Sequence, residues 1–94
     1  MRESKIEKRL TDLAKKHNFL AWKFKSTRKG VPDRIVVHDG AVYLVELKNE
    51  VGELEPMQLR ARELLLGQNV MAYTLGSIDA VNCWVRKMLK GDLK

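Results

Sequence analysis

Residues 33–48, DRIVVHDGAVYLVELK, place two apolar runs on either side of the pair Asp39-Gly40. An Asp-Gly pair with such flanks predicts a β-hairpin, because both positions of its two-residue turn require positive φ. Counting outward from this turn brings Asp33 directly opposite Glu46. The hairpin therefore predicts two carboxylates side by side on one face of a sheet.

Two carboxylates facing each other repel, so a sheet that keeps them there is destabilised unless something compensates. A divalent cation would do so, and Mg²⁺ or Mn²⁺ would take oxygen ligands from Asp33, Glu46 and the backbone carbonyl of Leu47. Lys48 lies on the same face as Glu46, since side chains alternate along a strand. Its ammonium group would position or help to deprotonate an attacking water and stabilise the charged transition state.

This set of residues predicts a metal site that cleaves phosphodiester bonds. The alternative gives each residue an ordinary structural place. Asp33 would then cap a turn, Glu46 would end a strand in solvent, and Lys48 would be a surface lysine or a salt-bridge partner of Glu46. A bare acid pair on a mostly apolar face needs compensation, which favours the metal site.

Gly30-Val31-Pro32-Asp33, followed after twelve residues by Glu46-Leu47-Lys48, resembles the signature of the PD-(D/E)XK nucleases. Glu7, in an early helical segment, and Gln58 narrow the likeness to the VRR-NUC branch, the virus-type replication-repair nucleases. The resemblance extends from about Glu3 to Met71. It implies a restriction-endonuclease-like fold, with residues 1–94 as a single VRR-NUC domain.

Glu7 and Gln58 each have two interpretations. In the resembled family an early-helix glutamate approaches the metal, in some members through water. Glu7 also follows Ser4 by three residues, which predicts a capping box, so two roles compete for one carboxylate. The amide of Gln58 would orient a phosphate or the nucleophilic water, or else it is an exposed side chain on a helix.

Basic side chains gather immediately before the Gly30–Asp33 segment, at Lys23, Lys25, Arg28 and Lys29. They place positive charge beside the predicted metal site, where a phosphate backbone would run. A solvated strand face is the ordinary alternative for such a run of charge. Gly30 is predicted to allow one backbone to approach another closely.

The remaining patterns predict the element order αβββαβα. A helix from Ser4 to about Lys16 is followed by a strand in residues 20–25, which has one basic face, and by the hairpin. Pro56 opens a second helix that ends at Gly67, residues 70–75 form a strand, and Ser77 caps a last helix. The fold class is thus α/β, a mixed central sheet flanked by helices.

Several side chains are assigned to the core. The hairpin strands are apolar on both faces, which predicts a central place in the sheet, covered on both sides by helices or a partner. Trp22, Trp84 and the methionines are predicted to be core residues rather than platforms for base stacking. Helical spacing predicts two buried stripes, one of Ile6, Leu10, Leu13, Ala14 and His17, the other of Ile78, Val81, Trp84, Val85, Met88 and Leu89.

Length and composition set limits on the class of protein. Ninety-four residues with 45% hydrophobic and 32% charged side chains predict one globular domain. No apolar run approaches the ~20 residues that span a bilayer, and no secretory signal is visible. Cys83 has no partner for an internal disulfide, which fits the cytoplasm, or the host cytoplasm for a phage protein. His17, His38 and Cys83 lack the spacing of a zinc site.

The leading functional hypothesis is a Mg²⁺- or Mn²⁺-dependent DNA endonuclease with no small-molecule cofactor and no membrane partner. A net charge of +6 and a pI of about 9.7 agree with a polyanionic partner. The resemblance implies more, because small stand-alone, often phage-encoded VRR-NUC proteins are similar to the Holliday-junction resolvases of DNA repair and act as homodimers. One domain offers one active site, whereas symmetric cutting of a four-way junction needs two.

Three alternatives remain. The first is a less specific flap or nicking nuclease, and the second is a non-catalytic DNA-binding module with a nuclease fold. Intact Asp33, Glu46 and Lys48 argue against that module. The third is a sequence-specific restriction-type enzyme, for which the chain looks too short to carry both a catalytic core and a reading element.

Overall fold

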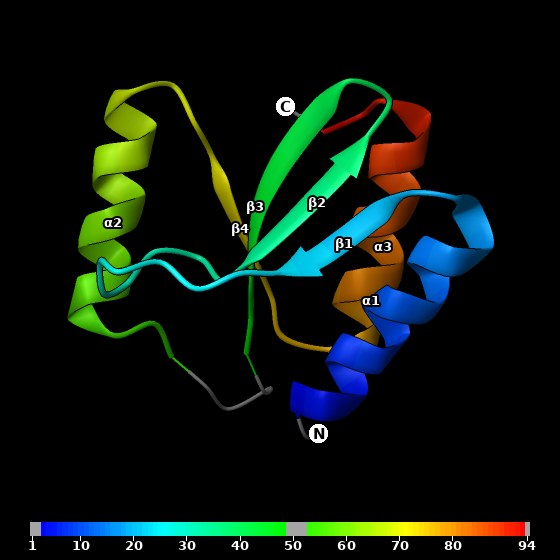
Figure 1. The fold of residues 1–94 in the computed structure, drawn as a ribbon, viewed down its shortest axis with the longest axis horizontal. Coiled ribbons are helices and arrows are strands. Elements are labelled where there is room, and N and C mark those ends of the chain that lie inside the picture. Colours follow the sequence, from blue (N-terminus) through cyan, green and yellow to red (C-terminus); the bar gives the residue numbers. More distant parts are fainter. Residues whose placement is uncertain (1–2, 49–52, 94) are drawn as a thin grey trace.

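Within residues 3–48 and 53–93, which the computed structural model describes, the strands form one sheet in the order β1-β2-β3-β4 (Figure 1). The first three strands are antiparallel neighbours, and β4 runs parallel to β3. The predicted element order and the mixed sheet are confirmed. The elements are α1 (Glu3–His17), β1 (Leu20–Lys23), β2 (Arg34–His38), β3 (Ala41–Leu47), α2 (Pro56–Gly67), β4 (Ala72–Leu75) and α3 (Ile78–Lys90).

The hairpin of β2 and β3 has the register that its turn predicts. Asp39 and Gly40 adopt φ values of 46° and 81°, as a turn with two left-handed positions requires. The pairs run from His38 opposite Ala41 to Arg34 opposite Val45. The next residues outward are Asp33 and Glu46, so the turn sets the relative position of the two acids.

One face of the sheet packs against α1 and α3, which lie side by side (Figure 1). Val36, Val45 and Leu47 have no exposed surface on this face, and buried positions of both helices cover them. Trp84 of α3 is buried as predicted. The predicted stripe of α1 is confirmed as far as Ala14, but His17 is exposed because the helix ends there, beyond the sheet that it covers.

The opposite face is covered only in part, since α2 packs on β4. Leu20, Trp22 and Val42 are 44%, 59% and 64% exposed. The prediction of Trp22 as a core residue is therefore wrong. Alternation along β1 turns Ala21, paired with Val36, toward the core and Trp22 away from it.

The methionines divide in the same way. Met57 and Met71 are exposed, against the prediction, while Met88 is buried. Helices were predicted to cover the hairpin on both sides, but they cover one face only. The reason is that α2 lies over the β4 edge of the sheet.

Helix starts follow the sequence signals except at α1. This helix already includes Glu3, so Ser4 lies inside it and the capping box predicted there is wrong. Pro56 opens α2 as predicted. The hydroxyl of Ser77 accepts a hydrogen bond from the backbone N–H of Ala80 at 3.0 Å and caps α3. None of the helices in the described ranges is both long enough and apolar enough to cross a membrane.

Candidate active site

Asp33 and Glu46 meet where β2 begins and β3 ends. The carbonyl of Asp33 accepts a hydrogen bond from the N–H of Phe24 at 2.9 Å, which continues the pairing of β1 with β2. Glu46 lies in β3 and is only 8% exposed. By alternation both acids lie on the face opposite Val36 and Val45, beside α2 rather than beside α1 and α3.

The electrostatics of Glu46 show which charges surround it. Burial raises the pKa of its carboxyl group to about 6, and the negative charge of Asp33 is the next largest cause. The charge of Lys48 acts in the opposite direction and lowers this pKa. Smaller effects come from Glu3, which raises it, and Arg62, which lowers it. The structure thus brings Asp33, Glu46 and Lys48 together, as the sequence predicts.

The Oδ1 atom of Asp33 is buried and has no hydrogen-bond partner among the described residues. A buried carboxylate oxygen without a partner destabilises the fold, and a cation would satisfy it. The residues present therefore fit a divalent cation. Within the described ranges no three His, Cys, Asp or Glu side chains form a metal-binding group, so this fit rests on the acid pair. Mg²⁺ suits such a site because it keeps several waters and takes substrate phosphate as a ligand.

Lys48 and Leu47 sit at the end of β3. The backbone N–H of Lys48 donates to the carbonyl of Leu75 at 3.1 Å, so pairing with β4 holds the backbone at this point. The Leu47 side chain is fully buried in the core on the other face. The role of the Leu47 carbonyl as a metal ligand stays a prediction.

Glu7 is held in an ion pair that the sequence did not predict. Its carboxylate accepts from the guanidinium group of Arg34, whose side chain is 7% exposed. This pair ties α1 to β2 and gives Glu7 a structural role, while its role at the metal stays a prediction. Glu3, one helical turn earlier on the same side of α1, is the acid of this helix whose charge acts on Glu46.

We expect Glu7→Gln to lower the free energy of unfolding by about 1–3 kcal/mol, because Arg34 loses its charged partner. Binding of Mn²⁺ to the folded variant should stay close to wild type. Urea denaturation in EDTA and calorimetric titration with Mn²⁺ measure the two quantities. Glu63→Gln, which removes an exposed ion pair with Arg60, is the matched control and should leave both quantities nearly unchanged. Unchanged stability with lost Mn²⁺ binding in Glu7→Gln would instead make Glu7 a ligand.

Gln58 caps α2. Its Oε1 accepts a hydrogen bond from the backbone N–H of Glu55, the N-cap residue, at 2.8 Å. No hydrogen bond of the described residues joins Gln58 to the acid pair or to Lys48. A capping role is thus sufficient to explain this residue, and its role toward phosphate stays a prediction.

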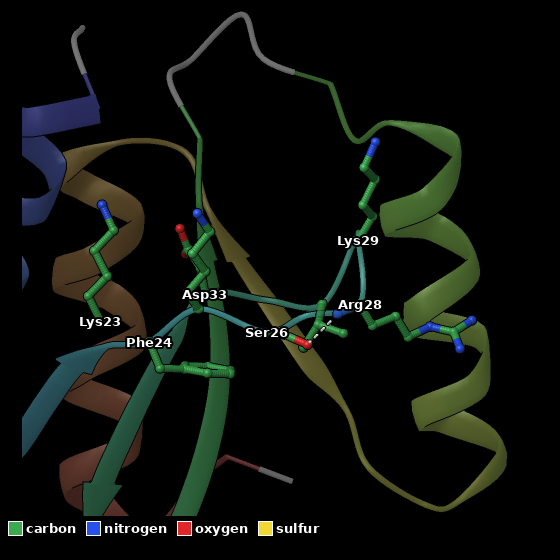
Figure 2. Close-up of a pocket in the computed structure, with 9 residues that line it drawn as sticks. Lys23, Phe24, Ser26, Arg28, Lys29 and Asp33 are labelled. Carbon is green, nitrogen blue, oxygen red and sulfur yellow. Dashed lines mark hydrogen bonds between the residues drawn. The ribbon is translucent and has the colours of Figure 1, made fainter.

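The predicted basic residues line an open cleft beside Asp33. Its volume is about 640 Å³, and its walls include Lys23, Lys25, Arg28 and Lys29 (Figure 2). All four side chains are exposed, which leaves their charges available to an anion.

Gly30 makes the close backbone approach that the sequence predicts. Its φ is +89°, and a Cβ atom there would lie 2.2 Å from the carbonyl oxygen of Met57. The basic loop is therefore pressed against the first turn of α2, at a position that only glycine fits.

Sequence reasoning missed four residues near the site: Glu3, Phe24, Arg62 and Thr74. Arg62 donates to the Ala72 carbonyl at 2.9 Å and to the hydroxyl of Thr74, the parallel partner of Glu46. Arg62 follows Gln58 by four residues, so helical spacing would have placed both on one face. No signal marks Thr74, because no short turn sets the register of a parallel strand.

No family model matches the sequence, and no curated protein matches it. The solved structures that match include the following two. One, described as "VRR_NUC domain", is 25% identical with a TM-score of 0.79 and covers 89% of this chain and 94% of its own. The other, "VRR_NUC domain protein", is 17% identical with a TM-score of 0.72 and covers 96% of this chain and 89% of its own.

The fold is that of an α/β nuclease-fold domain. More particularly, it is the fold of a VRR-NUC domain, which confirms the resemblance carried by Gly30–Asp33 and Glu46–Lys48.

Proposed function

We propose that this chain is a divalent-metal-dependent endonuclease that hydrolyses phosphodiester bonds in DNA. One observation carries the proposal, the buried and unpartnered Oδ1 of Asp33 beside the buried carboxyl group of Glu46. Such a pair destabilises the protein in the absence of a cation, so a binding function is the simplest reason to keep it.

The chain's own residues would divide the work as follows. Asp33, Glu46 and the Leu47 carbonyl would hold Mg²⁺ or Mn²⁺, which supplies positive charge that acidifies a bound water and offsets charge on the phosphate. Lys48, whose charge already acts on Glu46, orients the attacking water and stabilises negative charge on the phosphate oxygens. Glu3 is close enough to influence Glu46 and adds a further acid at the rim of the site.

DNA is the proposed substrate because of the charge beside the acids. Lys23, Lys25, Arg28 and Lys29 line the cleft that Asp33 also borders, and the whole chain carries +6. Contacts of this kind bind phosphates without reading sequence, so DNA shape rather than base sequence would select the substrate.

Action as a homodimer on branched DNA is the finer part of the proposal. It rests on the VRR-NUC resemblance and on the need for two sites to cut a four-way junction symmetrically. Exposed apolar side chains on the open sheet face, at Leu20, Trp22 and Val42, are of the kind that subunit interfaces bury. A less specific flap or nicking nuclease is the alternative.

The Lys48→Met variant tests the nuclease function. We expect wild type to cut DNA with Mg²⁺ or Mn²⁺ and not with EDTA. The variant should cut about 100- to 1,000-fold more slowly, because a charge that stabilises the transition state is lost. DNA affinity should change by less than about threefold, since one of many phosphate contacts is removed. Lys87→Met, on exposed α3 surface, is the matched control and should behave as wild type.

The substrates distinguish the alternatives. A labelled immobile four-way junction, a linear duplex and a flap are compared side by side. Paired symmetric cuts in the junction alone support a dimeric resolvase, while cutting of all three removes that specificity and keeps the nuclease. Tight binding without cutting in either metal would overturn the proposal in favour of a non-catalytic DNA-binding module.

A further inference from the structure

The cleft beside Asp33 contains an aromatic ring as well as positive charge. Phe24 lies in it, directly after the end of β1, between Lys23 and Lys25 in the sequence. In Figure 2 the ring of Phe24 extends into the space between Asp33 and the loop that carries Arg28 and Lys29. An aromatic face and cations therefore share one recess.

The core between the sheet and helices α1 and α3 does not account for this ring. Phe24 is half-buried, and it belongs neither to the core cluster of the described residues nor to the apolar side chains packed against that cluster. The aromatic ring contacts among the described residues involve Phe19, His38, Tyr43, Tyr73 and Trp84.

The position of Phe24 is nevertheless well defined. Its backbone N–H donates to the carbonyl of Asp33 at 2.9 Å, so the backbone of Phe24 is anchored next to a proposed metal ligand. On the other side, Gly30 presses the basic loop onto Met57 of α2. The recess between these two fixed backbones is thus held open by main-chain contacts.

We propose that this cleft binds an unpaired nucleotide, with its base stacked on Phe24 and its phosphates beside Lys25, Arg28 and Lys29. Stacking on aromatic side chains combined with a basic groove is how proteins hold single-stranded nucleic acid. A volume of about 640 Å³ lies within the ~300–1,000 Å³ of sites that enclose small organic ligands. A base inside an intact duplex is already stacked on its neighbours and does not reach the ring.

This inference rests on the proposed function in taking DNA as the ligand, and it deepens it by naming the substrate class. The DNA carries a single-stranded segment next to the scissile phosphate, as a flap or an opened branch point does. Asp33 then flanks the nucleotide on the side of the metal site.

The test compares binding of single-stranded oligothymidylate of about 12 nucleotides, a length that covers one site, with binding of a blunt duplex. Fluorescence anisotropy in EDTA measures both affinities without cleavage. Phe24→Leu should bind the single strand about 10-fold more weakly and the duplex unchanged, since only the stacking face is lost. Leu66→Ala removes a 60% exposed apolar side chain outside the cleft and is the control, with no change expected.

A second variant keeps the test valid if Phe24→Leu does not fold. Phe24→Trp retains an aromatic face, so it should keep wild-type affinity, and its added indole fluorescence should be quenched by oligothymidylate and not by duplex. Equal weakening of both DNAs by Phe24→Leu, or no quenching in Phe24→Trp, overturns the inference.

These outcomes are separate from those of the nuclease proposal. Metal-dependent cutting by wild type, with single-strand binding that is indifferent to Phe24, would leave the nuclease standing without this site. Single-strand binding that depends on Phe24, without cutting in any metal, would support the site and remove the nuclease.

Discussion

The Asp33→Asn variant should lose cleavage and, in the absence of metal, be more stable than wild type. We expect the cleavage rate to fall by about 1,000-fold or more, because the amide is a poor ligand for a hard cation and the charge that holds it is halved. Stability rises because the repulsion from Glu46 disappears, and because the buried atom without a partner then belongs to a neutral amide, which costs less to bury than a charged carboxylate. A residue whose replacement makes the fold more stable is characteristic of a functional site.

The gain in stability should depend on pH in a defined direction. The pKa of Glu46 is about 6 in the folded protein and near 4.5 when unfolded, so the folded state binds the proton more tightly. Stability of the metal-free wild type therefore falls as pH rises from about 4.5 to about 6, and the full loss persists above that window. Without the Asp33 charge this pKa moves back toward its ordinary value, so the advantage of Asp33→Asn is largest above pH 6.

Urea denaturation in EDTA at pH 5 and pH 7.5 measures this difference. We expect Asp33→Asn to gain about 1 kcal/mol at the higher pH, the upper end of what like charges directly opposite each other on a sheet cost. Asp39→Asn, in the exposed turn, is the matched control, since asparagine tolerates the positive φ of that position and should change little.

Bound Mn²⁺ should make wild type more stable than Asp33→Asn, the reverse of the order expected without metal. Mn²⁺ at a hundredfold excess over its dissociation constant stabilises wild type by about 2.7 kcal/mol, and the variant should gain little of this. An Asp33→Asn variant that is less stable than wild type at pH 7.5 in EDTA, or that keeps the full Mn²⁺ shift, would contradict the assignment of a metal site.

Gly30→Ala should destabilise the protein strongly, although it adds only one methyl group. A left-handed backbone at φ +89° costs a residue with a side chain about 1–2 kcal/mol. The added Cβ would also lie 2.2 Å from the carbonyl oxygen of Met57, a backbone atom that moves only with the first turn of α2. We expect a total loss of about 3 kcal/mol or more in the free energy of unfolding.

Gly40→Ala separates the cost of the left-handed backbone conformation from the cost of the clash with a neighbouring atom. Gly40 has φ +81°, but a Cβ there has no neighbour within 4 Å, so only the backbone conformation is penalised. This control should lose about 1–2 kcal/mol and keep wild-type cleavage. Gly30→Ala should also bind DNA more weakly at temperatures where it is folded, because the loop that carries Arg28 and Lys29 is displaced. Equal losses of stability in the two variants would show that the approach to α2 does not constrain the loop.

Local chemistry made much of the site predictable. The Asp39-Gly40 turn determines the register of the hairpin, and the register determines that Asp33 and Glu46 are neighbours, because side chains alternate strictly along each strand. Pro56 and Ser77 mark helix starts for reasons confined to a few residues. The sequence predicted that Gly30 allows another backbone to approach closely, but it did not predict that this backbone is that of Met57 in α2.

Side chains whose neighbours are distant in the sequence were not predictable in the same way. Leu20, Ala21 and Trp22 are all apolar, so the pattern of β1 alone does not say which of them faces the core. Glu3 and Glu7 lie on one side of α1, and the position of Arg34 in β2 decides that Glu7 is the one held in an ion pair.

The sequence by itself thus determined the hairpin, the element order and the pairing of the two acids, because turn geometry and strand alternation act over a few bonds. Only the tertiary structure decided which other residues surround the two acids. The parallel register of β4 brings Thr74 beside Glu46, and the packing of α2 on β4 brings Arg62 to Thr74. The packing of the Gly30 loop against α2 leaves the cleft in which Phe24 lies. These contacts join residues of different helices, strands and loops, and no turn geometry or strand alternation within a few residues specifies them.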